Sequence, residues 1–156
     1  MKITYEDKLN EIFEQIGNHA KLVLATSQLD RVSARNMSFI IHNHIFYFQT
    51  DKTFRKYQDI KANSKVALCL DNIQIEGICE DIGHPLDNEE FCSQFKCHFL
   101  SSFDAYSKLE NERLLIVKPT FIQRWNYVGG KPIIEQFYIN EKKYHEQEYN
   151  TNKNQI

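Results

Sequence analysis

The segment 48–63, FQTDKTFRKYQDIKAN, carries the clearest chemical signal in this sequence. Its second half has the apolar spacing of a short helix, and Thr53 stands where an N-cap residue is expected. A helix start has a partial positive charge and favours Asp or Glu, but Lys52, Arg55 and Lys56 crowd this one. Free amides at a helix start, together with several cations, form a site for phosphate or a similar anion. The alternative is a solvated helix with outward-pointing cations, which is the commoner meaning of a charge run.

Two positions outside the helix extend this predicted anion site. Thr50 adds a hydroxyl just before the helix, and Arg35 can reach over from the preceding strand within 33–38, SARNMS. Asn is depleted in strands, and a charged Arg in mid-strand also needs a reason. Strand alternation places Arg35 and Asn36 on opposite faces, so one of them points to a packed or ligand-lined side. An exposed strand face is the equally weighted alternative.

Histidines and cysteines give a weaker signal. His84, Cys92, Cys97 and His98 suggest zinc by proximity in the sequence. The spacing of the two cysteines fits no standard zinc site, and a second C-x-x-C pair is missing. No G-x-S-x-G, H-E-x-x-H or paired-carboxylate motif supports hydrolysis. We therefore expect no metal site and assign no catalytic side chain.

The composition is that of an ordinary soluble single domain. The chain has 156 residues, of which 42% are hydrophobic and 26% charged, with a net charge of -2. This balance shows no bias towards nucleic acid, and the apolar runs are too short to span a membrane. The start lacks a secretory pattern, which predicts a cytoplasmic protein, and the Lys, Asn and Ile content hints at a bacterial source. All four cysteines are then expected to be reduced, with Cys69 and Cys79 in the core.

Three helical regions are expected to flank the strands. An amphipathic helix begins after Thr4, with Asp7 completing a weak capping box. The helix of segment 48–63 is the second. A helical insert covers about 87–109, starting from the D-x-x-E pattern at Asp87 and containing a second short helix at 103–109.

The remaining pattern predicts hairpins of antiparallel strands. The expected strands are 21–28, 32–41, 45–50, 65–71, 73–83, 113–127 and 133–140. Pro119 lies inside one of them and demands an edge, a bulge or a bend. Hairpins of this kind in a small domain favour a closed barrel, so the predicted class is α+β with an antiparallel barrel core. We expect one domain over 1–140 and a polar, fraying tail over 141–156.

The order of several short motifs adds a family resemblance. These are LAT (24–26), SARNMS (33–38), YFQT (47–50), Lys56, NSKVALCL (63–70) and IQIEG (73–77). In order and spacing they resemble the pyridoxamine 5′-phosphate oxidase-like flavoproteins, the FMN-binding split barrels. The match covers about the first half of the chain, and LIVKPTFIQRW (115–125) resembles the family's last long strand more loosely. The resemblance implies a six-stranded antiparallel split β-barrel of Greek-key type with flanking helices.

The resemblance also implies which anion the basic helix start binds, namely the 5′-phosphate of FMN. Lys56 matches the family's phosphate lysine, and Asn72 lies near a position from which some members reach the flavin across a dimer interface. The resemblance further implies a homodimer with FMN at its interface. The implied cofactor-binding residues are Arg35, Asn36, Met37, Gln49, Thr50, Lys52, Arg55, Lys56 and Asn72.

The function implied by the resemblance is an FMN-dependent oxidoreductase that passes electrons or hydride, with NAD(P)H as a possible donor, to a small-molecule acceptor. The segment 141–156 lacks the Arg and Trp that grip pyridoxal phosphate in the true oxidases, so authentic pyridoxamine phosphate oxidation is not expected. One alternative is non-catalytic storage or sensing of flavin or haem, with His84, His98 or His145 as haem ligands. Another is a split barrel that has lost its cofactor.

Overall fold

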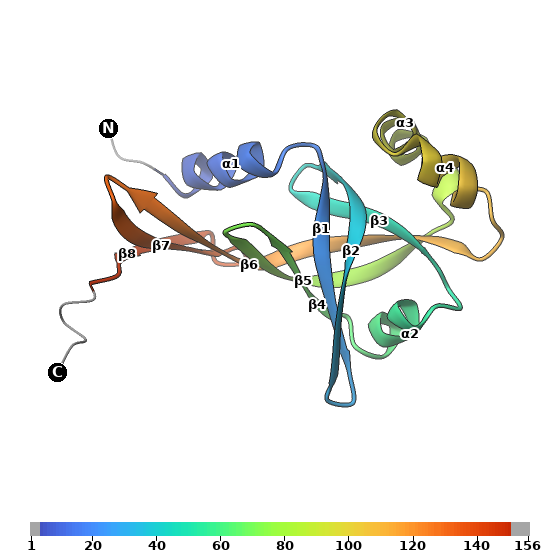
Figure 1. Cartoon of the computed structure of the whole chain (residues 1–156), viewed down its shortest axis with the longest axis horizontal. Coiled ribbons are helices and arrows are strands. Elements are labelled where there is room, and N and C mark those ends of the chain that lie inside the picture. Colours follow the sequence, from blue (N-terminus) through green and yellow to red (C-terminus); the bar gives the residue numbers. More distant parts are fainter. Residues whose placement is uncertain (1–3, 151–156) are drawn as a thin grey trace.

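The computed structural model describes residues 4–150, whose strands form one antiparallel sheet that closes into a barrel (Figure 1). The strands are β1 (His19–Gln28), β2 (Arg31–His42), β3 (Ile45–Asp51), β4 (Lys65–Leu70), β5 (Ile73–Gly83), β6 (Glu112–Val128), β7 (Lys131–Tyr138) and β8 (Lys143–Glu148). Their order is β3-β2-β1-β4-β5-β6-β7-β8, and pairing of β3 with β6 closes the first six into a barrel. Since β1 to β3 are successive hairpin strands and β4 returns beside β1, the order is a Greek key. The predicted α+β fold with a six-stranded antiparallel barrel is confirmed.

The barrel interior is built from alternate residues of each strand, as the period of two requires. Leu24, Phe39, Phe46 and Phe48 have no exposed surface and belong to one core cluster. Leu24 pairs directly with Arg35 across β1 and β2, and paired residues share a face of the sheet. Arg35 therefore lies on the inward face, near one end of the barrel.

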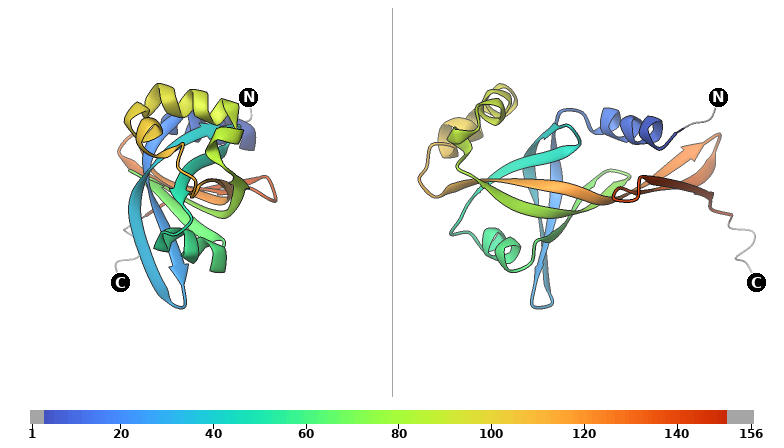
Figure 2. Two further views of the ribbon diagram at one scale, coloured as in Figure 1. Left: turned by 90° about the vertical axis from the view of Figure 1, so that its right-hand side faces the viewer. Right: turned by 180° about the vertical axis from the view of Figure 1, so that it is seen from behind.

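Helix α1 (Tyr5–Ile16) packs its apolar stripe against the barrel and the strands beyond it. The expected capping box is present, because the Thr4 and Asp7 side chains each accept a hydrogen bond of 3.2 Å from the other's backbone amide. Buried residues at helical spacing join α1 to the core, and these are Leu9, Ile12 and Ile16. The helix lies over the part of the sheet where β7 and β8 extend beyond the barrel (Figures 1 and 2).

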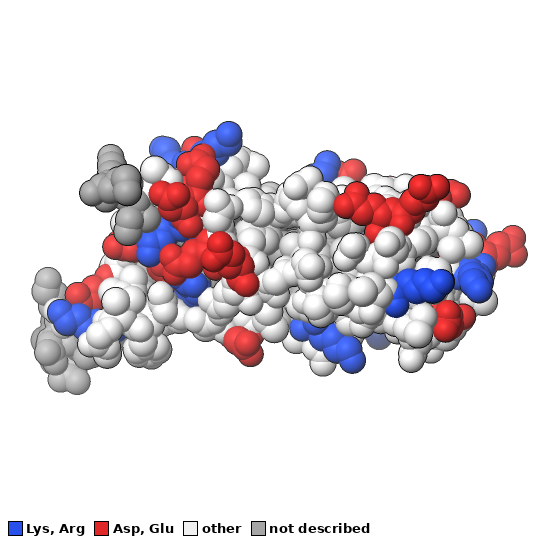
Figure 3. Space-filling view, turned by 90° about the horizontal axis from the view of Figure 1, so that it is seen from above, with Lys and Arg blue, Asp and Glu red and all other residues white. Residues whose placement is uncertain are grey.

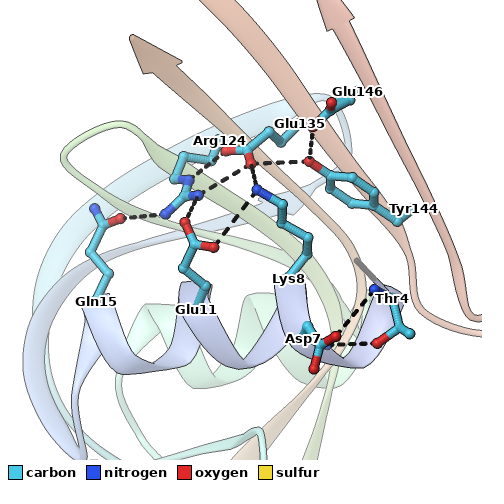
Figure 4. A network of polar contacts seen from close by, with 9 residues as sticks. All are labelled: Thr4, Asp7, Lys8, Glu11, Gln15, Arg124, Glu135, Tyr144 and Glu146. Atoms are coloured by element: carbon cyan, nitrogen blue, oxygen red, sulfur yellow. Dashed lines mark hydrogen bonds and ion pairs between the residues drawn. The ribbon is translucent and has the colours of Figure 1, made fainter. Parts of the chain in front are cut away.

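A polar network whose central pair, Arg124 and Glu135, is buried holds α1 to this extension (Figure 4). Its members are Lys8, Glu11, Gln15, Arg124, Glu135, Tyr144 and Glu146. Arg124 of β6 is 4% exposed and Glu135 of β7 is 1% exposed, and Arg124 Nε donates to Glu135 Oε1 at 2.6 Å. Arg124 also donates to Glu11 at 2.8 Å. Paired charges of this kind are tolerated in the interior only with such complete hydrogen bonding.

Helix α2 (Arg55–Ala62) packs against β1 on the opposite side of the barrel from α1 (Figure 2). Ile60 enters the core cluster. Asp59 is completely buried, where it accepts hydrogen bonds from Arg31 Nη2 at 2.6 Å and from Thr26 Oγ1 at 3.2 Å. These two buried side chains hold α2 against the barrel.

The helical insert forms a second small core on the outer face of the barrel. It consists of the short 3-10 helix η1 (Pro85–Asp87), α3 (Glu89–His98) and α4 (Leu100–Tyr106). Phe91, Phe95 and Phe103 are buried against Ile40 of β2 and Leu114 of β6. The insert therefore stands over β2, β3 and the beginning of β6 (Figure 1). Some of its residues line a cavity together with Phe54 and Lys56 at the start of α2.

Four local predictions are wrong, and each has a structural cause. Within the tail predicted to fray, Lys143–Glu148 forms β8 on the free edge of β7, and positions 151–156 lie outside the described residues. Asn88, not Asp87, caps α3, since its side chain accepts from the Phe91 amide. The second helix of the insert starts at Leu100, because α3 ends at His98 and Phe99 alone separates the two helices. Cys69 is exposed, because its neighbour Leu68 takes the inward face of β4.

Two other predictions are confirmed, those for Pro119 and for Cys79. The register of β5 against β6 shifts between Glu76 and Gly77, opposite Phe121 and Pro119, which is the irregularity that the proline demands. Cys79 is buried, and none of the four cysteines, all of which lie within 4–150, forms a disulfide. Within the same range, every helix is too short or too polar to cross a membrane.

Candidate functional site

A cavity of ≈ 380 Å³ lies between the start of α2 and the α3–α4 pair. Its lining residues are Asn36, Met37, Ser38, Gln49, Thr50, Asp51, Phe54, Lys56, Phe95, Ser102, Tyr106, Leu109 and Glu112. Five of the nine predicted cofactor-binding residues are among them, from β2, β3 and α2. Strands and a helix that are separate in the sequence are thus brought to one place by the barrel and its crossover helix.

The first turn of α2 begins differently from the prediction. Phe54 is the N-cap residue and has no side chain that caps the helix, so the predicted cap at Thr53 is wrong. The Thr53 amide and hydroxyl both donate to Asp51 Oδ1 at 2.7 Å, which ties Thr53 into the preceding turn. No acidic residue lies in the first turn of the helix. Its free amides therefore remain available beside the basic side chains.

Lys56 points from this turn into the cavity. Its Nζ donates to Thr50 Oγ1 at 3.3 Å and lies 4.9 Å from the centre of the Phe54 ring. Burial is the main cause that lowers the Lys56 pKa, and repulsion from Arg35 lowers it further. Attraction to Glu112 and Asp51 opposes these two effects without cancelling them. A half-buried ammonium whose charged form is disfavoured in this way would gain from a bound anion.

Arg35 approaches the same place from the inward face of β2. Its Nη1 donates to Leu24 O at 3.2 Å and to Thr26 Oγ1 at 3.0 Å. Burial lowers the Arg35 pKa first, attraction to Asp59 opposes this, and repulsion from Arg55 lowers it again. Asp59 is already paired with Arg31 at 2.6 Å.

Three cations that interact with one another lie here without an ion pair to a carboxylate. Over residues 4–150, neither Arg35, Arg55 nor Lys56 takes part in an ion pair. Asn36, on the opposite face of β2 from Arg35, lines the cavity, so the predicted alternation holds. Lys56 is the cation of the cavity lining, Asp51 and Glu112 are its acids, and the two arginines lie outside the lining. Three cations free of ion pairs near a partly apolar hollow suit a ligand with a phosphate at one end.

Four of the nine predicted residues do not line the cavity, and Arg35 and Arg55 are two of them. The other two, Lys52 and Asn72, lie elsewhere. Lys52 is exposed in the loop before α2, and its backbone bonds to Asn111 and Gln58 while its side chain stays outside the cavity lining. Asn72 is in the β4–β5 turn, where it accepts from Gln15 Nε2 at 2.9 Å and donates to the Trp125 carbonyl at 2.6 Å. Its predicted contact is with the flavin of a partner chain, and that contact stays a prediction.

The structure adds site residues that the sequence did not indicate. Phe95, Ser102, Tyr106 and Leu109 of the helical insert line the cavity opposite β2 and β3. Buried Ser107 Oγ donates to Gln49 Oε1 at 2.7 Å, and this hydrogen bond fixes the side chain of Gln49, one of the predicted residues. Only the tertiary packing of α3 and α4 brings these residues to the site, and no local motif marks them.

The buried carboxyl group of Glu112 also belongs to the lining. It is the Cα partner of Asp51 across β3 and β6. Burial, and then repulsion from Asp51, raises the Glu112 pKa to about 7. No sequence pattern distinguishes this glutamate from the exposed ones in the chain.

The histidines and cysteines do not converge on a metal site. His84 uses both ring nitrogens, one near the Leu109 carbonyl at 2.8 Å and one near the Leu86 amide at 3.1 Å. The His98 ring stacks on His19 at 3.7 Å. Within residues 4–150, the structure contains no group of three or more His, Cys, Asp or Glu side chains that could hold a metal ion.

Charge is distributed unevenly over the face that carries α1 and the insert. Acidic side chains form two groups on this face, one over each end, with a largely uncharged band between them (Figure 3). Glu6 and Asp7 of α1, and Glu89 and Glu90 of α3, are among the exposed acidic residues of these helices. An anionic ligand is therefore expected to bind more favourably at the cationic start of α2, on the opposite side of the barrel from α1.

Solved structures with the same fold include several named proteins. PhzG from Burkholderia lata 383, crystallised with tetrahydrophenazine-1-carboxylic acid, is 15% identical with a TM-score of 0.62, covering 93% of this chain and 95% of that one. A pyridoxamine 5′-phosphate oxidase-related, FMN binding protein from Nostoc punctiforme PCC 73102 is 13% identical with a TM-score of 0.60, covering 96% and 98%. HutZ, a heme storage protein from Vibrio cholerae, is 18% identical with a TM-score of 0.55, covering 75% and 91%.

These similarities define the class of the fold. No family model matches this sequence, and no curated protein matches it. The chain has the split-barrel fold found in pyridoxamine 5′-phosphate oxidase-like proteins, as the motifs suggested. Proteins with this fold include both an FMN binding protein and a heme storage protein, so the fold alone does not choose the cofactor.

Proposed function

We propose that this protein binds FMN in the cavity between α2 and the α3–α4 pair and acts as an oxidoreductase. The observation that carries the proposal is a group of three cations that form no ion pair. Lys56 lines the cavity, and Arg35 interacts electrostatically with both Lys56 and Arg55. A phosphate dianion supplies the negative charge that this group lacks. The Thr50 hydroxyl, 3.3 Å from Lys56 Nζ, provides a further hydrogen bond donor or acceptor at the same end.

The rest of the cavity fits a flavin in its chemical character. Met37, Phe54, Phe95 and Leu109 offer apolar contact to an aromatic ring system. Asn36 offers an amide for the polar edge of the ring or for the ribityl chain. A bound flavin would supply the electron-accepting chemistry, while these side chains hold it and exclude water.

The proposal includes a homodimer and a soluble electron donor. A second copy of the chain would complete the cover of the flavin, with Asn72 reaching the partner's site, and NAD(P)H would reduce it. The acceptor would be a small molecule. Light scattering of the purified protein, followed by anaerobic addition of NAD(P)H to the flavin-loaded form, checks both parts.

The decisive experiment is a binding titration with FMN and with riboflavin, which lacks the phosphate. Changing both Arg55 and Lys56 to Ala removes two charge-assisted contacts, each worth about 1.5–3 kcal/mol, so FMN affinity should fall by at least about 100-fold. Riboflavin affinity should change little. Lys61→Ala is the matched control, because Lys61 is an exposed cation in the last turn of the same helix.

Two results would contradict the assignment of the site. The first is wild-type protein that keeps no FMN after desalting, shown by the absence of a two-band flavin spectrum. The second is a double variant that binds FMN as tightly as the wild type. Bound FMN that NAD(P)H never reduces with any acceptor would leave the binding site intact and assign the protein to flavin storage.

A second candidate function is haem binding, favoured by the fold shared with a heme storage protein. Of the expected haem ligands, His84 already has a hydrogen bond partner for each ring nitrogen. His98 is partly buried and stacks on His19, and His145 is exposed on β8. A Soret band on adding haem, lost in His98→Ala or His145→Ala, would support this function in place of the first.

A further inference from the structure

Glu112 is a buried acid without a partner, and it lines the proposed cofactor cavity. The residue is 4% exposed and borders the cavity together with Thr50 and Lys56. Across residues 4–150, no side chain or amide donates a hydrogen bond to its carboxyl group, and it forms no ion pair. Within residues 4–150 no fully buried side-chain oxygen lacks a partner, so the unpaired Glu112 oxygens keep some accessible surface. Since Glu112 lines the cavity, the cavity is the side from which a partner can come.

The charged and titratable groups around Glu112 come from three elements. Asp51 lies beside it on β3, Lys56 faces it from α2, and His84 lies near it just before η1. Neighbouring Arg113 on β6 is turned away and pairs with Asp81 at 2.9 Å. The cavity-lining residues of β2 and α4 are uncharged, and they are Asn36, Met37, Ser38, Ser102 and Tyr106.

This environment opposes a charged carboxylate. Burial and Asp51 raise the Glu112 pKa to about 7, although Lys56 and His84 pull it down. An ionised Glu112 would also repel a phosphate bound by Lys56. A protonated carboxyl group has the opposite effect, because its O–H donates a hydrogen bond to a phosphate oxygen.

We propose that Glu112 contacts the phosphate of the ligand in its protonated form, so that the phosphate and a proton bind to the site together. The inference rests on the proposed function and adds a residue and a proton to it. Lys56, Arg35 and Arg55 provide the charge, and Glu112 provides a neutral donor that is present only when the carboxyl group holds its proton.

The linkage predicts how affinity depends on pH. If only the protonated form binds the phosphate, affinity should fall about tenfold from about pH 6 to about pH 8, as a group with a pKa near neutrality loses its proton. Glu112→Gln keeps a neutral donor of the same shape at every pH. Its FMN affinity should therefore be high throughout and should show only the titration of the FMN phosphate itself.

Asp51→Asn is the informative companion variant. The Asn side chain can still accept from Thr53 and keep the turn, but it no longer raises the Glu112 pKa. The pH at which affinity begins to fall should therefore move down, while the fall itself remains. Glu76→Gln, at an exposed site on β5 outside this cavity, is the control for changing an acid to its amide.

The experiment is calorimetric titration of the full chain with FMN, riboflavin and inorganic phosphate from about pH 6 to about pH 8, in buffers of different ionisation enthalpy that report proton uptake. Wild type should take up a proton with FMN and with phosphate but not with riboflavin, and Glu112→Gln should take up less. Equal pH profiles for wild type and Glu112→Gln would overturn the inference while leaving FMN binding in place. Failure to bind FMN at any pH would instead overturn the proposed function. If inorganic phosphate also fails to bind, the proposed function and the inference about Glu112 are both overturned.

Discussion

Replacing Arg124 by Met should strongly destabilise the protein, because the polar network of Figure 4 depends on this guanidinium. Arg124 makes two hydrogen bonds to Glu135, at 2.6 and 3.2 Å, and one each to Gln15 and Glu11. Its removal leaves the Glu135 carboxylate, 1% exposed, without its main counter-charge.

The magnitude follows from what remains around Glu135. Removing one partner of a buried pair costs about 3–5 kcal/mol. Lys8 Nζ at 3.6 Å and the Tyr144 hydroxyl at 3.0 Å still face the carboxylate, which places the expected loss at about 3 kcal/mol. For a chain of this size, that corresponds to a Tm lower by about 6–12 °C.

Urea unfolding followed by circular dichroism and by tryptophan fluorescence measures the effect. Trp125 is the only tryptophan and is the next residue on β6, so its fluorescence reports on the extension itself. The matched control is the double variant Arg124→Met, Glu135→Leu, which removes both charges and should recover most of the loss. A loss below about 1 kcal/mol in the single variant, or a double variant as unstable as the single one, would refute the reasoning.

Three further predictions concern other parts of the chain. Interaction with Arg124 holds the Glu135 pKa below its usual value near 4.5 despite burial, so the stability it contributes is present above about pH 4.5 and disappears as the pH falls through the lower folded value. Urea midpoints measured across this acidic range should therefore drop less in Glu135→Gln than in wild type, and an equal drop would contradict this. Gly77→Ala should cost about 1–3 kcal/mol of unfolding free energy, because the new Cβ would lie 2.7 Å from the Lys118 carbonyl oxygen and from Val117 Cγ1; Glu76→Ala beside it is the control, and equal urea midpoints would count against the close approach. A thiol reagent should label exposed Cys69 and Cys97 in the native protein but reach Cys79, whose burial raises its pKa to about 12, only after unfolding, and mass spectrometry of the labelled peptides would show any exception.

The local elements were predictable because their signals are local. The capping box at Thr4, the hairpins and the irregularity at Pro119 each depend on residues within a few positions of one another. The cation-rich start of α2 was visible for the same reason. Thr53 shows the limit of such reasoning. Its hydroxyl was expected to cap the helix, but in the structure it donates to Asp51 in the preceding turn.

The tail and Cys69 show why other predictions failed. A polar segment such as Lys143–Glu148 forms a strand only because β7 offers an unpaired edge, which is a property of the sheet and not of the segment. Cys69 lies in an apolar strand, but the face on which it falls is decided by the register of β4 against β1 and β5.

The sequence by itself determined the class of fold and one end of the candidate site, because periodicity fixes the elements and the basic helix start is contiguous. Only the tertiary structure decided which residues complete that site. Barrel closure between β3 and β6 sets Glu112 beside Asp51, and packing of the insert brings Phe95 and Tyr106 over β2 and β3. Such contacts join residues distant in the chain, and their energies depend on burial and neighbouring charge, which a one-dimensional pattern does not record.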